Sequence, residues 1–205
     1  MRALILVDIQ NDFMPGGALP VADGDAVVPL ANELQRQFEL VVATQDYHPP
    51  DHGSFASRHP GHEAGETVEL GGVEQVLWPD HCVAGTPGAS FHSALDVAGW
   101  AAVLKKGTDT IIDSYSGFFD NAHRRDTGLG GFLRGRAVSD VYICGLATDY
   151  CVNFTALDAA RFGLQAHVVV PACRGVDLQP GDSERALAGM REAGVRLINT
   201  VNLPD

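Results

Sequence analysis

The sequence predicts an α/β protein: a three-layer α/β/α sandwich around a mostly parallel central sheet. Two observations predict this fold. Short segments that are apolar at every position alternate along the chain with segments whose apolar residues recur every three or four positions. Strands without a polar face are typical of parallel sheets, because helices cover both faces and each side chain must be buried.

Six apolar, β-branched runs are expected to form the strands, at residues 3–7, 40–43, 101–104, 138–146, 167–170 and 195–198. Helical spacing falls between them at residues 26–38, 152–160 and 182–193, the last with Asp182 or Ser183 as its cap. Two irregular regions, residues 47–73 and 115–131, are long enough to suggest functional loops. Residues 54–73 are our candidate for a loop that closes over a site. We see no linker, so we expect one domain over residues 1–205.

Composition excludes several classes of function. The chain has 14 Lys and Arg against 26 Asp and Glu, a formal charge of −12, so it lacks the basic surface that a nucleic acid or an anionic membrane requires. No stretch approaches the roughly 18 apolar residues of a membrane span, and the first apolar run ends at Asp8. We therefore expect a cytoplasmic protein with free thiols, whose small-molecule partner is neutral or cationic. The oligomeric state stays open, a homo-oligomer included.

Polar residues follow several predicted strands: Asp8, Asp46, Lys106 and the segment 145–151. Parallel sheets bind ligands beyond the carboxyl ends of their strands, so the fold would bring these residues to one edge. Cys151 begins a predicted helix, where backbone N–H groups favour a thiolate, and a nearby lysine would lower the thiol pKa further. Asp8 could accept the thiol proton. Taken alone, however, a cysteine such as Cys151 is more often a buried, inert residue, and Lys105 competes with Lys106.

A second group, Asp46, His48, His52 and the more distant His81, has the residue types of a catalytic metal site, which keeps a position open for substrate. Spacing alone does not choose among zinc, iron and manganese, nor does it exclude a histidine-rich surface loop. The aromatic side chains of Phe13, Trp78 and Tyr115 could form the walls of a slot for a flat ring, or simply pack in the core.

These segments together resemble the nicotinamidase/pyrazinamidase family of the isochorismatase-like cysteine hydrolases. The matching pieces occur in the family's order at residues 7–13 (VDIQNDF), 46–49 (DYHP), 78–82 (WPDHC), 106–107 (KG), 114–118 (SYSGF) and 145–152 (GLATDYCV). The resemblance implies an isochorismatase-like fold and hydrolysis of nicotinamide to nicotinate and ammonia, and of pyrazinamide to pyrazinoate, through a cysteine thioester in NAD salvage.

The resemblance also implies roles for individual residues. The catalytic triad would be Asp8, Lys106 and Cys151. A cis peptide between Leu146 and Ala147 would place the N–H groups of Ala147 and Cys151 as an oxyanion hole. The implied ligands of one divalent metal ion, zinc first and iron or manganese as alternatives, are Asp46, His48 and His81, with His52 as an open fourth. The substrate would contact Phe13, Trp78, Tyr115 and Leu146.

Two other readings remain. A related amidase would act on another small amide or ureido compound, which a substrate screen would reveal. A metal- or thiol-based binding protein would hold the metal without turnover, although a retained Asp8, Lys106 and Cys151 argue against it.

Overall fold

A computed structural model describes residues 1–201 and 203 of the chain. Its centre is a six-stranded sheet in which every pair of neighbouring strands is parallel. The strands lie in the order β5 (Ala102–Lys106), β2 (Val41–Asp46), β1 (Arg2–Val7), β6 (Asp140–Leu146), β7 (Gln165–Arg174) and β8 (Arg196–Ile198). The predicted parallel sheet is thus confirmed.

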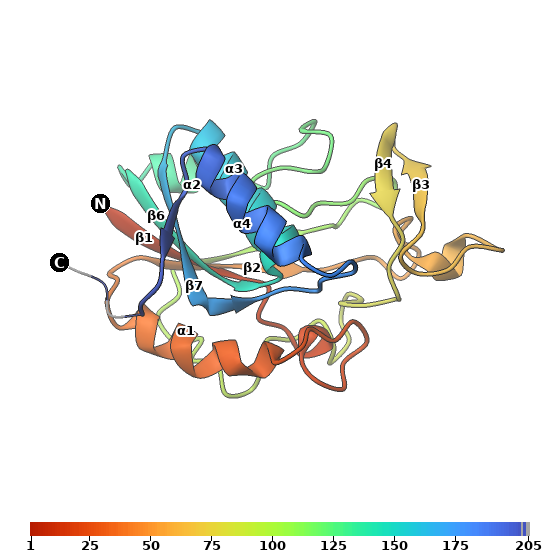
Figure 1. Ribbon diagram of the computed structural model, residues 1–205, viewed down its shortest axis with the longest axis horizontal. Coiled ribbons are helices and arrows are strands. Elements are labelled where there is room, and N and C mark those ends of the chain that lie inside the picture. Colours follow the sequence, from red (N-terminus) through yellow and green to blue (C-terminus); the bar gives the residue numbers. More distant parts are fainter. Residues whose placement is uncertain (202, 204–205) are drawn as a thin grey trace.

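Helices cover both faces of this sheet (Figure 1). Helix α1 (Val27–Gln35) packs on one face, and α3 (Asn153–Arg161) and α4 (Asp182–Glu192) lie on the other. A short helix, α2 (Leu129–Arg134), precedes β6. The result is the expected three-layer sandwich. None of the helices in the described part of the chain combines the length and apolarity that crossing a membrane requires.

Burial explains which runs became central strands. Leu4, Ile5 and Leu6 of β1 are at most 1% exposed, since their side chains point alternately into the two helical layers. Strand β5 lies at the sheet edge, and there Val103 keeps 42% of its surface exposed. The apolar sequence of β1 therefore matches its central place.

The chain changes direction across the sheet between β1 and β6. From β1 it continues to β2 and β5 on one side, and it returns to β6 on the other side of β1. A crevice opens at such a switch point, beyond the carboxyl ends of the two strands. Asp8 directly follows β1, and Cys151 lies five residues after the end of β6, so both border this crevice.

Among the α-helices and strands, three were not predicted from the sequence: α2 and the two strands of a hairpin. The region 47–73 was expected to be irregular, but β3 (Thr67–Leu70) pairs antiparallel with β4 (Val73–Val76) in a hairpin at the end of the molecule away from the N-terminus (Figure 1). Gly71 and Gly72 form its turn with φ of 61° and 80°. Only residues without a Cβ adopt such φ values easily, and a Gly-Gly pair between two alternating segments is the sequence signal of this hairpin.

Candidate active site

The carboxylate of Asp8 lies at the centre of the site and is completely buried. It follows β1 with a left-handed backbone (φ 49°), which an aspartate tolerates better than most residues. Its Oδ1 accepts a hydrogen bond of 2.6 Å from the hydroxyl of Thr44 on β2, and its Oδ2 lies 2.9 Å from Nζ of Lys106. Asp8 is thereby fixed from two neighbouring strands.

Lys106 connects the candidate residues with one another. Its Nζ forms ion pairs with Asp8 and with Oδ1 of Asp46, lies 3.3 Å from Sγ of Cys151, and donates 3.0 Å to the carbonyl of Ser114. Burial alone would lower the pKa of Lys106, but the carboxylates of Asp46 and Asp8 outweigh it and raise that pKa well above its usual value. The amine therefore stays charged. Its neighbour Lys105 is exposed and lies over the Tyr47 ring.

Cys151 belongs to a π-helical turn, Thr148–Val152, that leads into α3. The carbonyl of Ala147 accepts hydrogen bonds from the N–H groups of Tyr150 and Val152, on either side of Cys151. The peptide between Leu146 and Ala147 is cis, as the resemblance predicted.

Gly145 lets the strand leading to this turn lie close to β1. Its φ is 124°, and a Cβ at this position would lie 2.1 Å from the carbonyl oxygen of Val7. Any side chain here would force β1 and β6 apart, and with them Asp8 and Cys151.

The titration properties correct one prediction. The sequence predicted a net lowering of the Cys151 thiol pKa. Burial instead raises this pKa well above its usual value, although Lys106 pulls it down. Burial, together with the charge of Asp46, also raises the pKa of Asp8 to about 6, against the pull of Lys106 and Thr44. At neutral pH the resting pair is therefore a neutral thiol beside an ionised carboxylate that can take its proton.

Three further side chains form a buried group next to this pair. Asp46, His48 and His81 each offer one atom, and these atoms lie within 4.8 Å of one another. Nδ1 of His48 faces the carbonyl of Gly107 at 2.8 Å, and Nδ1 of His81 faces that of Pro79 at 2.7 Å. A carbonyl only accepts, so both Nδ1 atoms carry a proton, and in the neutral form of each ring Nε2 keeps a lone pair.

The arrangement suits a divalent metal ion. Nε2 of His48 and of His81 lie 3.7 and 3.8 Å from Oδ2 of Asp46, and Nε2 of His48 is buried without a hydrogen-bond partner among the described residues. Metal-binding histidines commonly donate their other nitrogen to a carbonyl, as both do here. Burial would raise the pKa of Asp46, but Lys106 and His48 hold it well below its usual value. Burial and the neighbouring His48 lower the pKa of His81 to about 4.

His52 has a different hydrogen-bond pattern. Its ring lies 4.4 Å from that of His48, and its side chain forms a second buried group with His48 and Asp113. The backbone N–H of Ser54 donates 3.2 Å to Nδ1 of His52. An N–H can only donate, so Nδ1 accepts and the neutral ring carries its proton on Nε2. Because burial lowers the pKa of His52, the neutral form is favoured. In that tautomer Nε2 presents an N–H, and it too is buried without a hydrogen-bond partner among the described residues.

A small pocket with a free volume of about 20 Å³ lies in front of Cys151. That is roughly the room of one water molecule, so its lining, and not its size, indicates what it could bind. Three of the residues expected around the substrate line this pocket, namely Phe13, Trp78 and Tyr115. Asp46, His81 and Ala147 line it as well. Leu146 does not line it: its side chain is 1% exposed and packs in the core. Tyr150, to which the sequence gave no role, takes that place, with its ring 4.8 Å from Trp78 and nearly perpendicular to it.

Several residues of the site escaped sequence reasoning because only the fold brings them there. Thr44 holds Asp8, and Ser114 offers its carbonyl to Lys106. Gln10 binds the backbone of Asp46 on both sides, accepting from its N–H and donating to its carbonyl, each at 2.8 Å. Asp113 lies at the pocket wall. Gln10 belongs to the motif VDIQNDF at residues 7–13. Its place two residues after Asp8 is the sequence signal that could have indicated a role in the site.

Comparison with known proteins agrees with this geometry. The model of the isochorismatase domain matches residues 2–201. The nicotinamidase of Escherichia coli is 48% identical over 200 residues, 96% of this chain and 93% of that protein. The structure of the Acinetobacter baumanii nicotinamidase and pyrazinamidase superposes with a TM-score of 0.93 at 47% identity, covering 96% of this chain and 95% of that one.

A zinc complex of the Pyrococcus horikoshii pyrazinamidase is also similar, with a TM-score of 0.81 at 41% identity over 97% of this chain and 99% of that one. These matches extend over nearly the whole chain and include the strands that carry the site. The chain belongs to the isochorismatase domain family and, within it, to the nicotinamidases and pyrazinamidases.

Proposed function

We propose that this protein hydrolyses nicotinamide to nicotinate and ammonia, and pyrazinamide to pyrazinoate, through a thioester on Cys151. The observation that carries the proposal is the single amine of Lys106 in contact with Asp8, Asp46 and Cys151. This amine connects the nucleophile Cys151 and its base Asp8 to the candidate metal ligand Asp46, beside one small pocket. Nicotinate is a precursor of NAD, so the reaction would serve NAD salvage. We also propose that residues 1–205 work as one domain.

The first chemical step would be proton transfer. Asp8, with a pKa raised to about 6, is ionised at neutral pH and accepts the proton of the Cys151 thiol. The charged Lys106, 3.3 Å from the sulfur, stabilises the thiolate as it forms. The thiolate then attacks the amide carbon, and a C–S bond replaces the C–N bond as Asp8 returns the proton to the departing ammonia.

The oxygen of the attacked carbonyl becomes negative during this step. We assign its stabilisation to the N–H groups of Ala147 and Cys151, because both residues line the pocket. Removing one such donor typically costs about 10²–10³ in rate. Water, activated by Asp8, then attacks the thioester, and its breakdown to nicotinate frees the thiol.

The metal ligands in this proposal are Asp46, His48 and His81, and we expect zinc, with iron and manganese as the alternatives. When bound, the ion would act as a Lewis acid that holds a ring nitrogen and orients the ring. Phe13 and Trp78 would hold the ring faces. We give His52 a supporting place behind His48, since its free nitrogen carries a proton.

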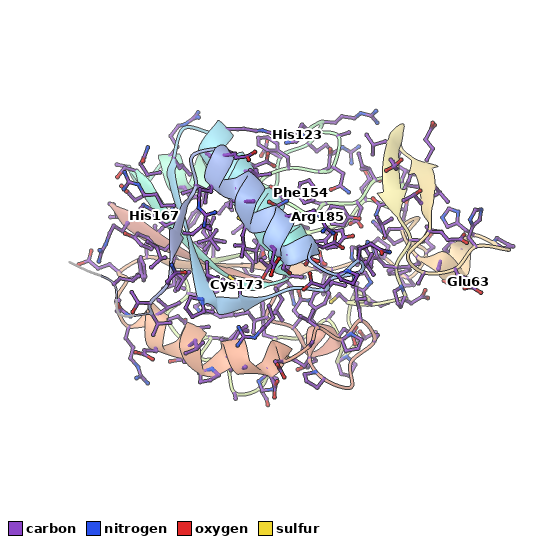
Figure 2. The ribbon with its side chains drawn as sticks, in the orientation of Figure 1. Glu63, His123, Phe154, His167, Cys173 and Arg185 are labelled. Carbon is purple, nitrogen blue, oxygen red and sulfur yellow. The ribbon has the colours of Figure 1, made fainter. Side chains whose placement is uncertain are left out.

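The test is ammonia release from nicotinamide by the purified protein, with zinc, iron or manganese added in parallel. Cys151→Ala should abolish the release. Cys173→Ala is the matched control, because Cys173 is also buried but lies on β7 outside the pocket (Figure 2). An acyl adduct on Cys151, trapped by acid quenching and seen by mass spectrometry, would support the thioester. Release that persists in Cys151→Ala would rule out covalent catalysis by this residue.

A further inference from the structure

The hairpin β3–β4 lies outside the central sheet, yet one of its residues forms hydrogen bonds to the pocket wall. Gln75 of β4 is 1% exposed, in contrast to its exposed neighbour Glu74. Its Nε2 donates 2.7 Å to the hydroxyl oxygen of Tyr115 and 2.7 Å to the carbonyl of the adjacent Val76, and it lies 3.3 Å from Oδ2 of Asp113. Its Oε1 accepts 3.0 Å from Nδ2 of Asn121. A buried amide with these partners connects the hairpin to two residues that line the pocket.

Tyr115 is held at both ends by this network. Its backbone N–H donates 2.9 Å to Oδ1 of Asn121, the residue whose amide donates to Gln75. Its hydroxyl oxygen accepts from Gln75 and also from Nε1 of Trp78, at 3.1 Å. Two donors occupy both lone pairs of that oxygen, so they fix the tip of the ring and its distance from Trp78.

We propose that Gln75 is a positioning residue for substrate binding, which sets the aromatic wall of Tyr115 and Trp78 that receives the ring of the amide. The inference rests on the proposed function. Gln75 reaches the pocket through Tyr115 and, over a longer bond, through Asp113. None of its hydrogen bonds among the described residues goes to Cys151 or Lys106. The wall faces the ring, which changes little between the bound substrate and the transition state. Loss of the wall should therefore raise KM while kcat stays nearly constant.

Gln75→Met keeps the length of the side chain and removes its hydrogen bonds. Gln75→Glu keeps an acceptor for Asn121, loses the donated bonds and places a second buried carboxylate beside Asp113. One lost hydrogen bond corresponds to roughly 3- to 10-fold in binding, so both variants should raise KM for nicotinamide by about that factor, with kcat within about twofold. Gln37→Met is the matched control, because Gln37 binds the backbone of Val201, far from the pocket residues in sequence.

A double-mutant cycle with Tyr115→Phe tests the route through Tyr115. The phenylalanine ring lacks the oxygen that Gln75 holds, so Gln75→Met should raise KM much less in that background than in the wild type. An equal rise in both backgrounds would overturn the proposal, as would a fall in kcat at unchanged KM. Thermal melts of each variant show whether a change merely reflects unfolding.

Binding is measured separately from turnover by tryptophan fluorescence. The chain has two tryptophans, so Trp100→Phe leaves Trp78 as the only reporter, and Cys151→Ala prevents reaction. Nicotinamide should quench Trp78, with a Kd about 3- to 10-fold higher when Gln75→Met is added; an unchanged Kd would refute the role of Gln75. If the wild type releases no ammonia, the proposed function fails, but the comparison of Kd values still decides whether Gln75 positions the aromatic wall. Absence of saturable quenching would overturn both.

Discussion

Replacement of Lys106 by methionine tests whether its amine holds the site together. Lys106 is 2% exposed and pairs with Asp8 and Asp46, which are 0% and 4% exposed. Methionine fills similar space and leaves two buried carboxylates without their cation. Removing one partner of a buried ion pair costs about 3–5 kcal/mol. For a chain of 205 residues, at roughly 2–4 °C per kcal/mol, Tm should fall by about 6–20 °C.

The loss should depend on pH in a defined direction. The pKa of Asp8 in the folded protein, about 6, already lies above its usual 3.8, and Lys106 is what keeps it from rising further. In Lys106→Met the folded carboxyl should therefore hold its proton to higher pH. A raised folded pKa favours the folded state at low pH, and that advantage is lost as pH rises through the folded pKa. The difference in Tm between wild type and variant should therefore be largest at pH 8 and shrink toward pH 5.

The assay is differential scanning calorimetry of the metal-free protein from pH 5 to 8. Lys105→Met is the control, since Lys105 is the adjacent lysine but is exposed over Tyr47. Its loss should change the stability by no more than about 1 kcal/mol. Equal Tm losses for the two variants, or a loss for Lys106→Met that grows toward pH 5, would refute the reasoning.

Three further predictions concern the same site. Log kcat/KM for nicotinamide should fall by about one per pH unit below about 6, as Asp8 takes a proton. Thr44→Val should move this acid limb of the pH profile to higher pH, because the Thr44 hydroxyl lowers the pKa of Asp8. An acid limb at the same pH in wild type and variant would contradict this. His48→Ala should reduce the metal bound per chain, measured by plasma mass spectrometry after dialysis, whereas the control His92→Ala should not. Gly145→Ala should destabilise the protein by several kcal/mol in denaturant melts, through its clash with β1; full stability would show that β1 and β6 can separate.

The sequence was sufficient for the layers and for the sheet, because a strand such as β1 that is apolar on both faces must be covered on both faces, as it is in a parallel sheet between helices. It was also sufficient to bring Asp8 and Lys106 to one edge, since both end parallel strands. It did not predict that the β3–β4 hairpin supports the pocket wall. The hairpin is locally readable from its Gly-Gly turn, but the burial of Gln75 against Tyr115 is a tertiary contact without a periodic signal.

Electrostatics limited the prediction in another way. From the charges near Cys151, the sequence predicts that Lys106 lowers the thiol pKa. Lysine does act in that direction, but the larger effect is desolvation, which depends on how completely the folded chain excludes water. The same burial raises the pKa of Asp8. The sign of both shifts could not be obtained without knowing which strands enclose the residues.

Asp46 explains why the two halves of the site occur together. Its Oδ1 pairs with Lys106, while its Oδ2 faces the Nε2 atoms of His48 and His81. A cation bound by Oδ2 would draw charge from the carboxylate and so weaken the hold of Asp46 on Lys106. The amine would then interact more strongly with Asp8 and with the developing thiolate of Cys151. One carboxylate therefore connects the group that would orient the substrate ring with the group that would attack its amide.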